Sequence, residues 1–235
     1  MTTLGVRPAS ARPISRPVRS GGMAQPALLV CGIVSSLLYA ATDLLGGLRY
    51  EGYSFTSQAV SELMATGAPS ESLVDPLFLA YDLLMLAFGI GVLREGARRN
   101  GFLRLTGALL IAYGLMGLAG PTLFEMRPRG TGSIATDLPH IVLTGALVLV
   151  TLLAIGVGAF ALGRRFRVYS AATFLTMIVL GVLSAPNGAR LAAGLPTPGF
   201  GIVERINIYA SLLWIAVLAV ALLRRPMYRD VRVLP

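Results

Sequence analysis

The stretch GGLRYEGYSFTSQAVSELMATGAPSESLVD, residues 46–75, separates the first two hydrophobic runs of a chain of 235 residues. It holds four of the eleven acidic residues, a centre rich in Ser and Thr, and an interrupted apolar pattern. A connection of this length that carries its own pattern commonly has a function. We therefore expect the rest of the chain to be arranged around this stretch, which we call the outer connection.

Apolar residues recur at helical spacing inside the outer connection. Phe55, Val60 and Leu63 belong to this series, and Ser, Gln and Glu fill the positions between. Gly67 and Pro69 end the run. The spacing predicts a short amphipathic helix that lies at the membrane surface or dips into it. The alternative is a solvated loop with one packed turn.

The composition is that of an integral membrane protein. Hydrophobic residues make up 55% of the chain, charged residues only 13%, and the mean hydropathy is +0.73. A soluble domain carries about 25% charged residues. The hydrophobic residues also gather in runs close to the length of about 20 residues that crosses a bilayer core.

Six such runs predict an all-α membrane protein, a bundle of six transmembrane helices. The runs cover about residues 26–45, 76–93, 103–123, 138–162, 168–185 and 202–223. The transmembrane domain is thus expected at residues 26–223, with the outer connection as a lid. Asp75 before Pro76, and Asp137 before Pro139, predict the starts of the second and fourth spans, because an N-cap followed by a first-turn proline is typical there.

Arginine supplies all the permanent positive charge of the side chains, and its distribution orients the bundle. Fifteen of the twenty arginines lie in two basic tails, residues 1–25 and 224–235, and in the connections 94–104 and 163–167. By the positive-inside rule, both termini are cytoplasmic and the outer connection faces outward from a bacterial plasma membrane. The first tail lacks apolar periodicity and is expected to be disordered. Although the net charge is +9, arginines confined to loops and tails argue against a nucleic-acid surface.

Polar residues that are costly in hydrocarbon gather at the outward ends of the spans. Asp43 lies near the outer end of the first span, and Asp82 lies about 9 Å inside the second, at a rise of about 1.5 Å per residue. His140 opens the fourth span, and Glu204 with Arg205 opens the sixth. A carboxylate inside a span should face the bundle interior and find a partner. These residues therefore predict an outward-facing polar pocket, ringed by helix N-termini.

The same residues also have structural interpretations. Asp43 would cap a helix end, and His140 would be a hydrogen-bonded imidazole without a catalytic role. Arg205 would pair with Glu204 or contact a lipid headgroup. For Asp82 a functional or network role is favoured, because carboxylates inside spans are rare.

Motifs for catalysis or cofactor binding are absent from the sequence. Ser61 precedes Glu62 but lacks the surrounding glycines of a nucleophile elbow. The one histidine has no paired-ligand spacing around it, so we expect no metal site. The sequence contains no glycine-rich phosphate loop, so we expect no nucleotide cofactor. The single cysteine, Cys31, lies in the first span, which is typical of a core thiol.

The segment EGYSFTSQAVSELMATGAP, residues 51–69, resembles the hallmark of bacterial and archaeal membrane proteins known as domain of unknown function 998 (DUF998). In that family a Gly-Tyr-Ser-like start, a Ser-Glu-Leu and a Gly-x-Pro close follow the first span. The matching positions are Gly52, Tyr53, Ser54, Ser61, Glu62, Leu63, Gly67, Ala68 and Pro69. GIVERI at residues 201–206 and His140 match as well. The resemblance implies a six-helix membrane protein and brings no established reaction.

One corner departs from the family pattern. The family often has a Phe-Pro motif followed by Asp at the end of the third span. Here residues 123–130 read LFEMRPRG, with Glu125 as the nearby acid. We therefore carry over no role from the family to residues 123–130.

We interpret the outward polar residues as a pocket that binds a lipid or small amphiphile without chemical turnover. The candidate ligand-binding residues are Asp43, Tyr53, Ser61, Glu62, Asp82, His140, Glu204 and Arg205. Three alternatives stay open. The protein is a structural subunit whose outer connection docks a partner protein, a membrane-embedded hydrolase with His140 or a carboxylate as general base, or a proton-coupled carrier using Asp82 and Asp43. Membrane lipids are partners in every case.

Overall fold

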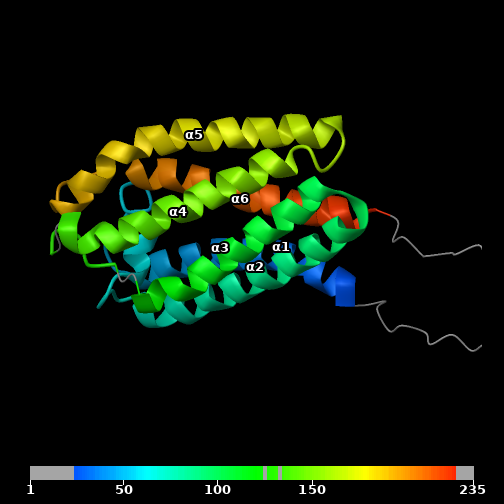
Figure 1. Cartoon of the computed structure of the whole chain (residues 1–235). Helices are drawn as coiled ribbons and strands as arrows, with labels where there is room; N and C mark the ends of the chain where they lie inside the picture. The colour runs from blue at the N-terminus through cyan, green and yellow to red at the C-terminus, as the bar shows by residue number, and fades with distance from the viewer. Residues whose placement is uncertain (1–23, 124–125, 132–133, 226–235) are drawn as a thin grey trace, which may run out of the picture.

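The computed structural model describes residues 24–123, 126–131 and 134–225 (Figure 1). The regular secondary structure of this part of the chain is all helical, and no strand occurs in it. The elements are α1 (Ala24–Arg49), the 3-10 helix η1 (Val60–Met64), α2 (Glu71–Arg99), α3 (Gly101–Leu123), α4 (Ile134–Gly158), α5 (Arg164–Ala192) and α6 (Phe200–Leu223). The basic tails predicted at 1–25 and 224–235 lie almost entirely outside the described residues.

All six α-helices are long and apolar enough to cross a membrane, which confirms the predicted class. Each overlaps its predicted span, but α2 and α4 begin about one turn earlier than expected. The prediction that Asp75 and Asp137 mark these starts is therefore wrong. In α2 the Ser70 carbonyl already accepts the N–H groups of Leu73 and Val74, so the helix is formed before Asp75 is reached. The prolines then lie one turn inside, where each removes a single intrahelical hydrogen bond.

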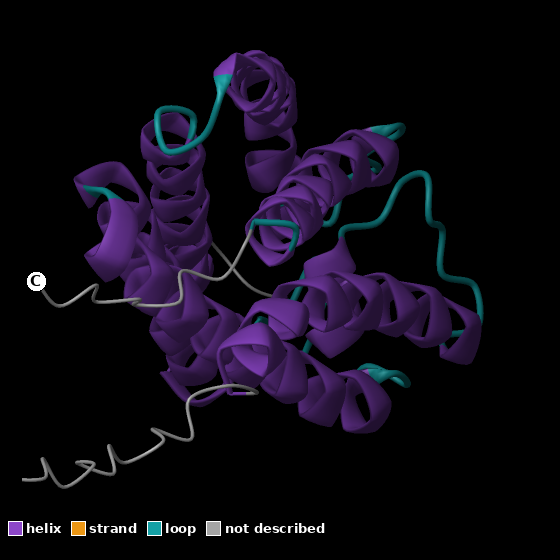
Figure 2. Ribbon diagram, turned by 90° about the vertical axis from the view of Figure 1, so that its right-hand side faces the viewer, coloured by secondary structure: helices purple, strands orange, loops and turns teal. Residues whose placement is uncertain are grey.

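The six α-helices form a ring in chain order. Each packs against the helices before and after it, and α6 returns to pack against α1. Figure 2 views this arrangement nearly along the helices. Ala24 and Leu223 lie at the same end of the bundle, which we call the terminal end (Figure 1). The opposite end, the loop end, carries residues 50–70, 126–131 and 193–199.

The backbones of α2 and α3 lie in direct contact. A Cβ atom at Gly107 would overlap the backbone of Leu93, and one at Gly96 would overlap the backbone of Arg104. Small residues permit such close approach between helices in a membrane. Asn100 forms the turn between them, and its Oδ1 accepts the N–H of Leu103 at 2.7 Å as an N-cap of α3.

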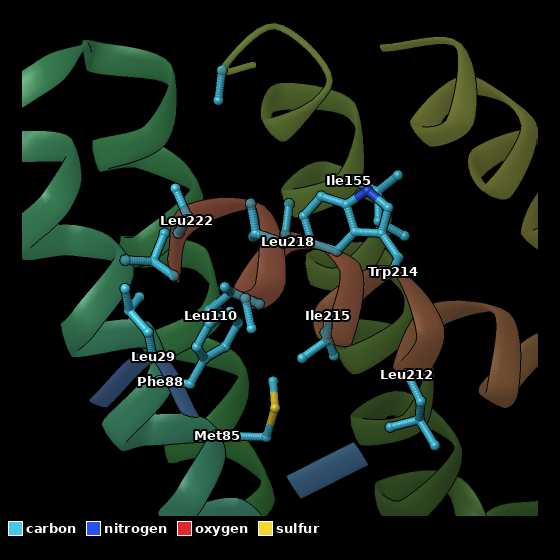
Figure 3. Packing of buried hydrophobic residues seen from close by; sticks show 14 of the residues in the cluster. Leu29, Met85, Phe88, Leu110, Ile155, Leu212, Trp214, Ile215, Leu218 and Leu222 are labelled. Carbon is cyan, nitrogen blue, oxygen red and sulfur yellow. The ribbon is translucent and has the colours of Figure 1, made fainter. Parts of the chain in front are cut away.

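One hydrophobic core joins all six α-helices, and Trp214 of α6 lies within it (Figure 3). The Trp214 side chain is 1% exposed and packs over Gly158 of α4. Its indole N–H donates to the Ser170 hydroxyl of α5 at 2.9 Å. A cavity of about 10 Å³ beside it has room for about one water molecule. A single side chain thus connects three helices in a nearly filled interior.

The apolar series of the outer connection packs on the bundle. Only residues 60–64 form a helix, of the 3-10 type, whereas residues 55–58 form turns. Val60 and Leu63 are buried in a small core with Val74 and Phe78 of α2. The predicted helix is therefore shorter than its apolar spacing indicated. Its apolar side chains need no membrane surface for burial, because protein covers them.

The loop-end halves of α4 and α5 are loosely packed. No residue from 136 to 153, and none from 178 to 196, is buried. A helix packed along one face normally turns about three or four residues toward the core in every two turns. The terminal-end halves do so, with Ile155 of α4 and Met177 of α5 inside the core. The contacts that hold α4 and α5 in the ring are therefore concentrated at the terminal end.

Candidate functional site

Arg205, near the start of α6, uses all of its N–H groups within the protein. Its Nε and Nη2 donate to the two carboxylate oxygens of Asp43 on α1, at 3.0 and 2.8 Å. Nη2 also donates to the Tyr53 hydroxyl at 2.6 Å. Nη1 donates to the backbone carbonyls of Phe55 and Gln58 at 2.8 and 3.0 Å. A guanidinium saturated in this way binds the outer connection and has no donor left for a ligand.

Asp43 is the buried partner in this ion pair, with an exposed fraction of 1%. Besides Arg205 it accepts a hydrogen bond from the Tyr209 hydroxyl, one turn further along α6. A buried ion pair is tolerated when its remaining polar atoms also find partners, as these do. Asp43 therefore joins α1 to α6 and does not cap a helix end.

Tyr53 links the ion pair to the outer connection. Its hydroxyl accepts from Arg205 and donates to the Ala59 carbonyl at 2.7 Å. Burial raises the pKa of the Tyr53 phenol well above its usual value, so the hydroxyl keeps its proton. The rings of Tyr53 and Phe55 lie 5.5 and 5.0 Å from the guanidinium carbon, within the range of cation–π attraction.

A second arginine, Arg129, holds the other side of the outer connection. Its Nε and Nη2 donate to the two carboxylate oxygens of Glu62 at 3.0 and 2.7 Å. It also donates to the Leu195 carbonyl and the Thr197 hydroxyl at 2.9 and 3.0 Å. Glu62 in turn accepts the Ala59 N–H at 2.8 Å at the start of η1. This pair joins the outer connection to the two other loops of the loop end.

Glu204 makes a third contact between α6 and the outer connection. Its Oε2 accepts the N–H of Val60, the first residue of η1, at 2.7 Å. The neighbouring Arg205 pairs with Asp43, so the predicted pairing of Arg205 with Glu204 is replaced by two separate contacts to different partners. Both contacts hold the outer connection against α6.

The structure brings five of the eight candidate residues into the hydrogen bonds that join the outer connection to the bundle, directly or through Arg205: Asp43, Tyr53, Glu62, Glu204 and Arg205. Of the remaining three, Ser61 lies within the outer connection itself, half-buried in η1. Asp82 lies on α2 with its carboxylate against Gly117 of α3, and His140 is half-buried on α4. The last two therefore belong to other walls of the ring.

Several residues of this network were not singled out by sequence reasoning. They are Gln58, Arg129, Thr197 and Tyr209. Arg129 had one signal, since it is among the few arginines on the arginine-poor side of the predicted bundle. Its partner Glu62 lies 67 residues away in the sequence, and no local sequence pattern predicts that contact.

A depression of about 300 Å³ opens beside the Glu62–Arg129 pair. It is lined by Ser54, Ser57, Gln58, Arg129, Pro196, Thr197 and Pro198. The side chain of Arg129 is 21% exposed there. Hydroxyl groups and a partly exposed guanidinium suit an anionic or hydroxyl-bearing group. Within residues 24–123, 126–131 and 134–225, no three His, Cys, Asp or Glu side chains are grouped as metal ligands.

We expect Glu62→Gln to release the segment that contains Arg129. The substitution replaces a carboxylate that accepts two charge-assisted hydrogen bonds from Arg129 with a neutral amide. A hydrogen bond to a charged group contributes about 1.5–3 kcal/mol. Trypsin cleavage after Arg129 should become about tenfold faster or more, since about 1.4 kcal/mol corresponds to a factor of ten. The measurement is a time course of proteolysis in detergent micelles.

The control for this experiment is Glu71→Gln. Glu71 accepts the Gly67 N–H at 2.7 Å at the same end of the bundle, and this hydrogen bond does not involve the Arg129 segment. Its cleavage time course should match that of the unmodified protein. Equal cleavage rates in Glu62→Gln and the unmodified protein would show that the ion pair does not restrain the segment.

Comparison with known proteins identifies a family and nothing more specific. The family model described as "Protein of unknown function (DUF998)" matches residues 33–221, which include most of the ring of helices. No curated protein and no solved structure matches the chain. The matched region contains the motif of residues 51–69 and both arginine pairs of the loop end. The chain therefore belongs to the DUF998 family of proteins of unknown function, as the motif of the outer connection predicted.

Proposed function

We propose that this protein is a non-enzymatic plasma-membrane protein that binds the polar group of a lipid or small amphiphile in the loop-end depression. The observation that carries the proposal is the depression itself, with the Arg129 guanidinium and the Ser57 and Thr197 side chains in its wall. Four of the five N–H groups of Arg129 are used within the protein, so the remaining N–H of Nη1 and the Ser57 hydroxyl would bind a phosphate or carboxylate. The arginine distribution supports cytoplasmic termini and an outward-facing depression.

The position of the depression supports an amphiphile over a free solute. Pro196 and Thr197 in its wall lie four and five residues after the end of α5, whose loop-end half contains no buried residue. Large apolar side chains of that half and of the loop after it, such as Val182 and Leu195, are 68% and 48% exposed. A ligand with its head in the depression would have apolar protein surface beside its tail.

The saturated Arg205 network supports binding without turnover. The carboxylates at the loop end that were candidate general bases accept hydrogen bonds from protein groups. Glu62 receives Arg129 and Ala59, and Glu204 receives the N–H of Val60. The network thus holds the outer connection in place as one wall of the depression.

We expect Ser57→Trp to abolish retention of the bound amphiphile. Ser57 lines the depression, and an indole there would occupy much of its volume of about 300 Å³. The measurement is native mass spectrometry of protein extracted in mild detergent, with lipids identified after dissociation. Wild-type protein should retain a lipid class that Ser57→Trp loses.

The matched control is Ser72→Trp, at an exposed position on the first turn of α2 outside the depression. It should retain the wild-type lipid. If Ser57→Trp carries the same lipid at the same stoichiometry as Ser72→Trp, the depression is not the binding site. Melting curves for both variants establish that each is folded.

A second candidate function is that of a subunit in a membrane complex. It is favoured by the loop-end half of α4, where no residue from 136 to 153 is buried, because a partner helix would cover it. The same native mass spectra decide this case. A protein adduct in place of a lipid adduct would favour the subunit.

A further inference from the structure

Asp82 is a buried carboxylate that has no partner among the residues that the structure describes. Its exposed fraction is 7%, and a Cβ atom added to Gly117 of α3 would overlap its carboxylate. The carboxylate therefore lies directly on the α3 backbone. Within the described residues it takes part in no hydrogen bond or ion pair, and no charged side chain acts on it. It differs in this respect from Asp43, whose charge is compensated by Arg205.

The titratable groups that face Asp82 are phenols. Tyr81 on α2 and Tyr113 on α3 are close enough to interact with its charge. The Tyr81 hydroxyl donates to that of Tyr113 at 3.0 Å, bridging the same two helices. From α1, Tyr39 packs edge-on against Tyr81 with ring centroids 5.0 Å apart. On η1, which also packs against α2, the charged residue is Glu62, and its carboxylate is paired with Arg129.

An isolated negative charge in this position would be costly. Hydrocarbon and apolar protein penalise an ionised carboxylate by several kcal/mol, whereas a protonated acid costs far less. The Asp82 carboxylate lies against Gly117 and the side chain is 7% exposed, so bulk water has little access to it. The close packing of α2 on α3 is therefore compatible with the neutral acid and opposes the anion.

We propose that Asp82 is a proton-binding site whose occupancy is coupled to the packing of α2 against α3. With the proton bound, the neutral acid lies on Gly117 and the two helices stay in contact. When the proton leaves to water, the carboxylate requires water or a cation, and the interface must loosen to admit it. This site responds to proton activity and is independent of the depression at the loop end.

The proposal is tested by infrared difference spectroscopy on protein in liposomes. A pH step between about 5 and about 9, above the range in which exposed aspartates titrate, should change a carbonyl band of a protonated carboxylic acid. That band should be lost in Asp82→Asn, which keeps the shape of the neutral acid. A wild-type spectrum without such a band, or one identical to that of Asp82→Asn, would overturn the proposal.

Two further comparisons keep the result unambiguous. Gly117→Ala displaces the carboxylate and should shift the band, whereas Gly145→Ala on α4, where a Cβ meets nothing within 4 Å, should leave it unchanged. If Asp82→Asn does not fold, the comparison of Gly117→Ala with Gly145→Ala shows whether the band belongs to Asp82. A band that Gly117→Ala leaves unaltered would overturn the assignment to Asp82. A sodium ion is the alternative occupant of the site, and replacing sodium with choline in the buffer tests for it. A spectral change that follows sodium and not pH would assign the site to a cation and overturn the proton.

Discussion

Arg205→Ala is expected to destabilise the folded protein by about 3–5 kcal/mol, the cost of removing one partner from a buried ion pair. The substitution leaves the Asp43 carboxylate, 1% exposed, without its counter-charge. It also removes the donors that the carbonyls of Phe55 and Gln58 and the Tyr53 hydroxyl now accept. The measurement is unfolding by a denaturing detergent, followed by the fluorescence of Trp214, the only tryptophan of the chain.

Two controls define the origin of this loss. Arg190→Ala removes an exposed arginine that donates to the Pro196 carbonyl, and it should change stability by less than about 0.5 kcal/mol. The double variant Asp43→Leu with Arg205→Leu removes both charges and should be more stable than Arg205→Leu alone, since no uncompensated charge remains. A double variant as unstable as the single one would mean that the hydrogen bonds to the outer connection, and not the ion pair, dominate.

Trp214→Ala is expected to cost about 3 kcal/mol, the lower end of the range for truncating a buried tryptophan. The lower end applies because unfolding within a micelle moves the indole into hydrocarbon and not into water. The loss comes from the cavity left between Gly158 of α4 and Phe166 of α5, and from the Ser170 hydroxyl, which loses its partner. Thermal unfolding followed by far-ultraviolet circular dichroism measures it without the tryptophan signal.

The neighbouring residue supplies the control for the tryptophan. Leu213 is 57% exposed on the outer face of α6, and Leu213→Ala should change stability by less than about 0.5 kcal/mol in micelles. Trp214→Phe, which keeps an aromatic ring but cannot donate to Ser170, should fall between the two. Equal stability of Trp214→Ala and Leu213→Ala would show that α4 and α5 are held in the ring by other contacts.

The candidate site was partly predictable from the cost of charge in hydrocarbon. That argument correctly expected Asp43 and Arg205 to be sheltered, but it could not pair them, because 162 residues separate them. It also expected Asp82 to find a partner, and the described residues contain none. The outward pocket was expected above these charges. Instead, Tyr53 and Phe55 of the outer connection cover Arg205, and the depression lies beside Arg129.

The sequence by itself determined the membrane class, the six spans and the family, because hydropathy and short motifs are local properties that need no knowledge of distant contacts. Tertiary structure alone decided which charges meet and which polar group stays alone. Those outcomes depend on the ring order of the helices and on a few glycines, such as Gly117 beneath Asp82, that set how closely two backbones approach. Differences of about an ångström in the distance between two helix backbones decide whether a carboxylate lies beside an arginine, a water molecule or a glycine. The packing of the whole bundle sets that distance.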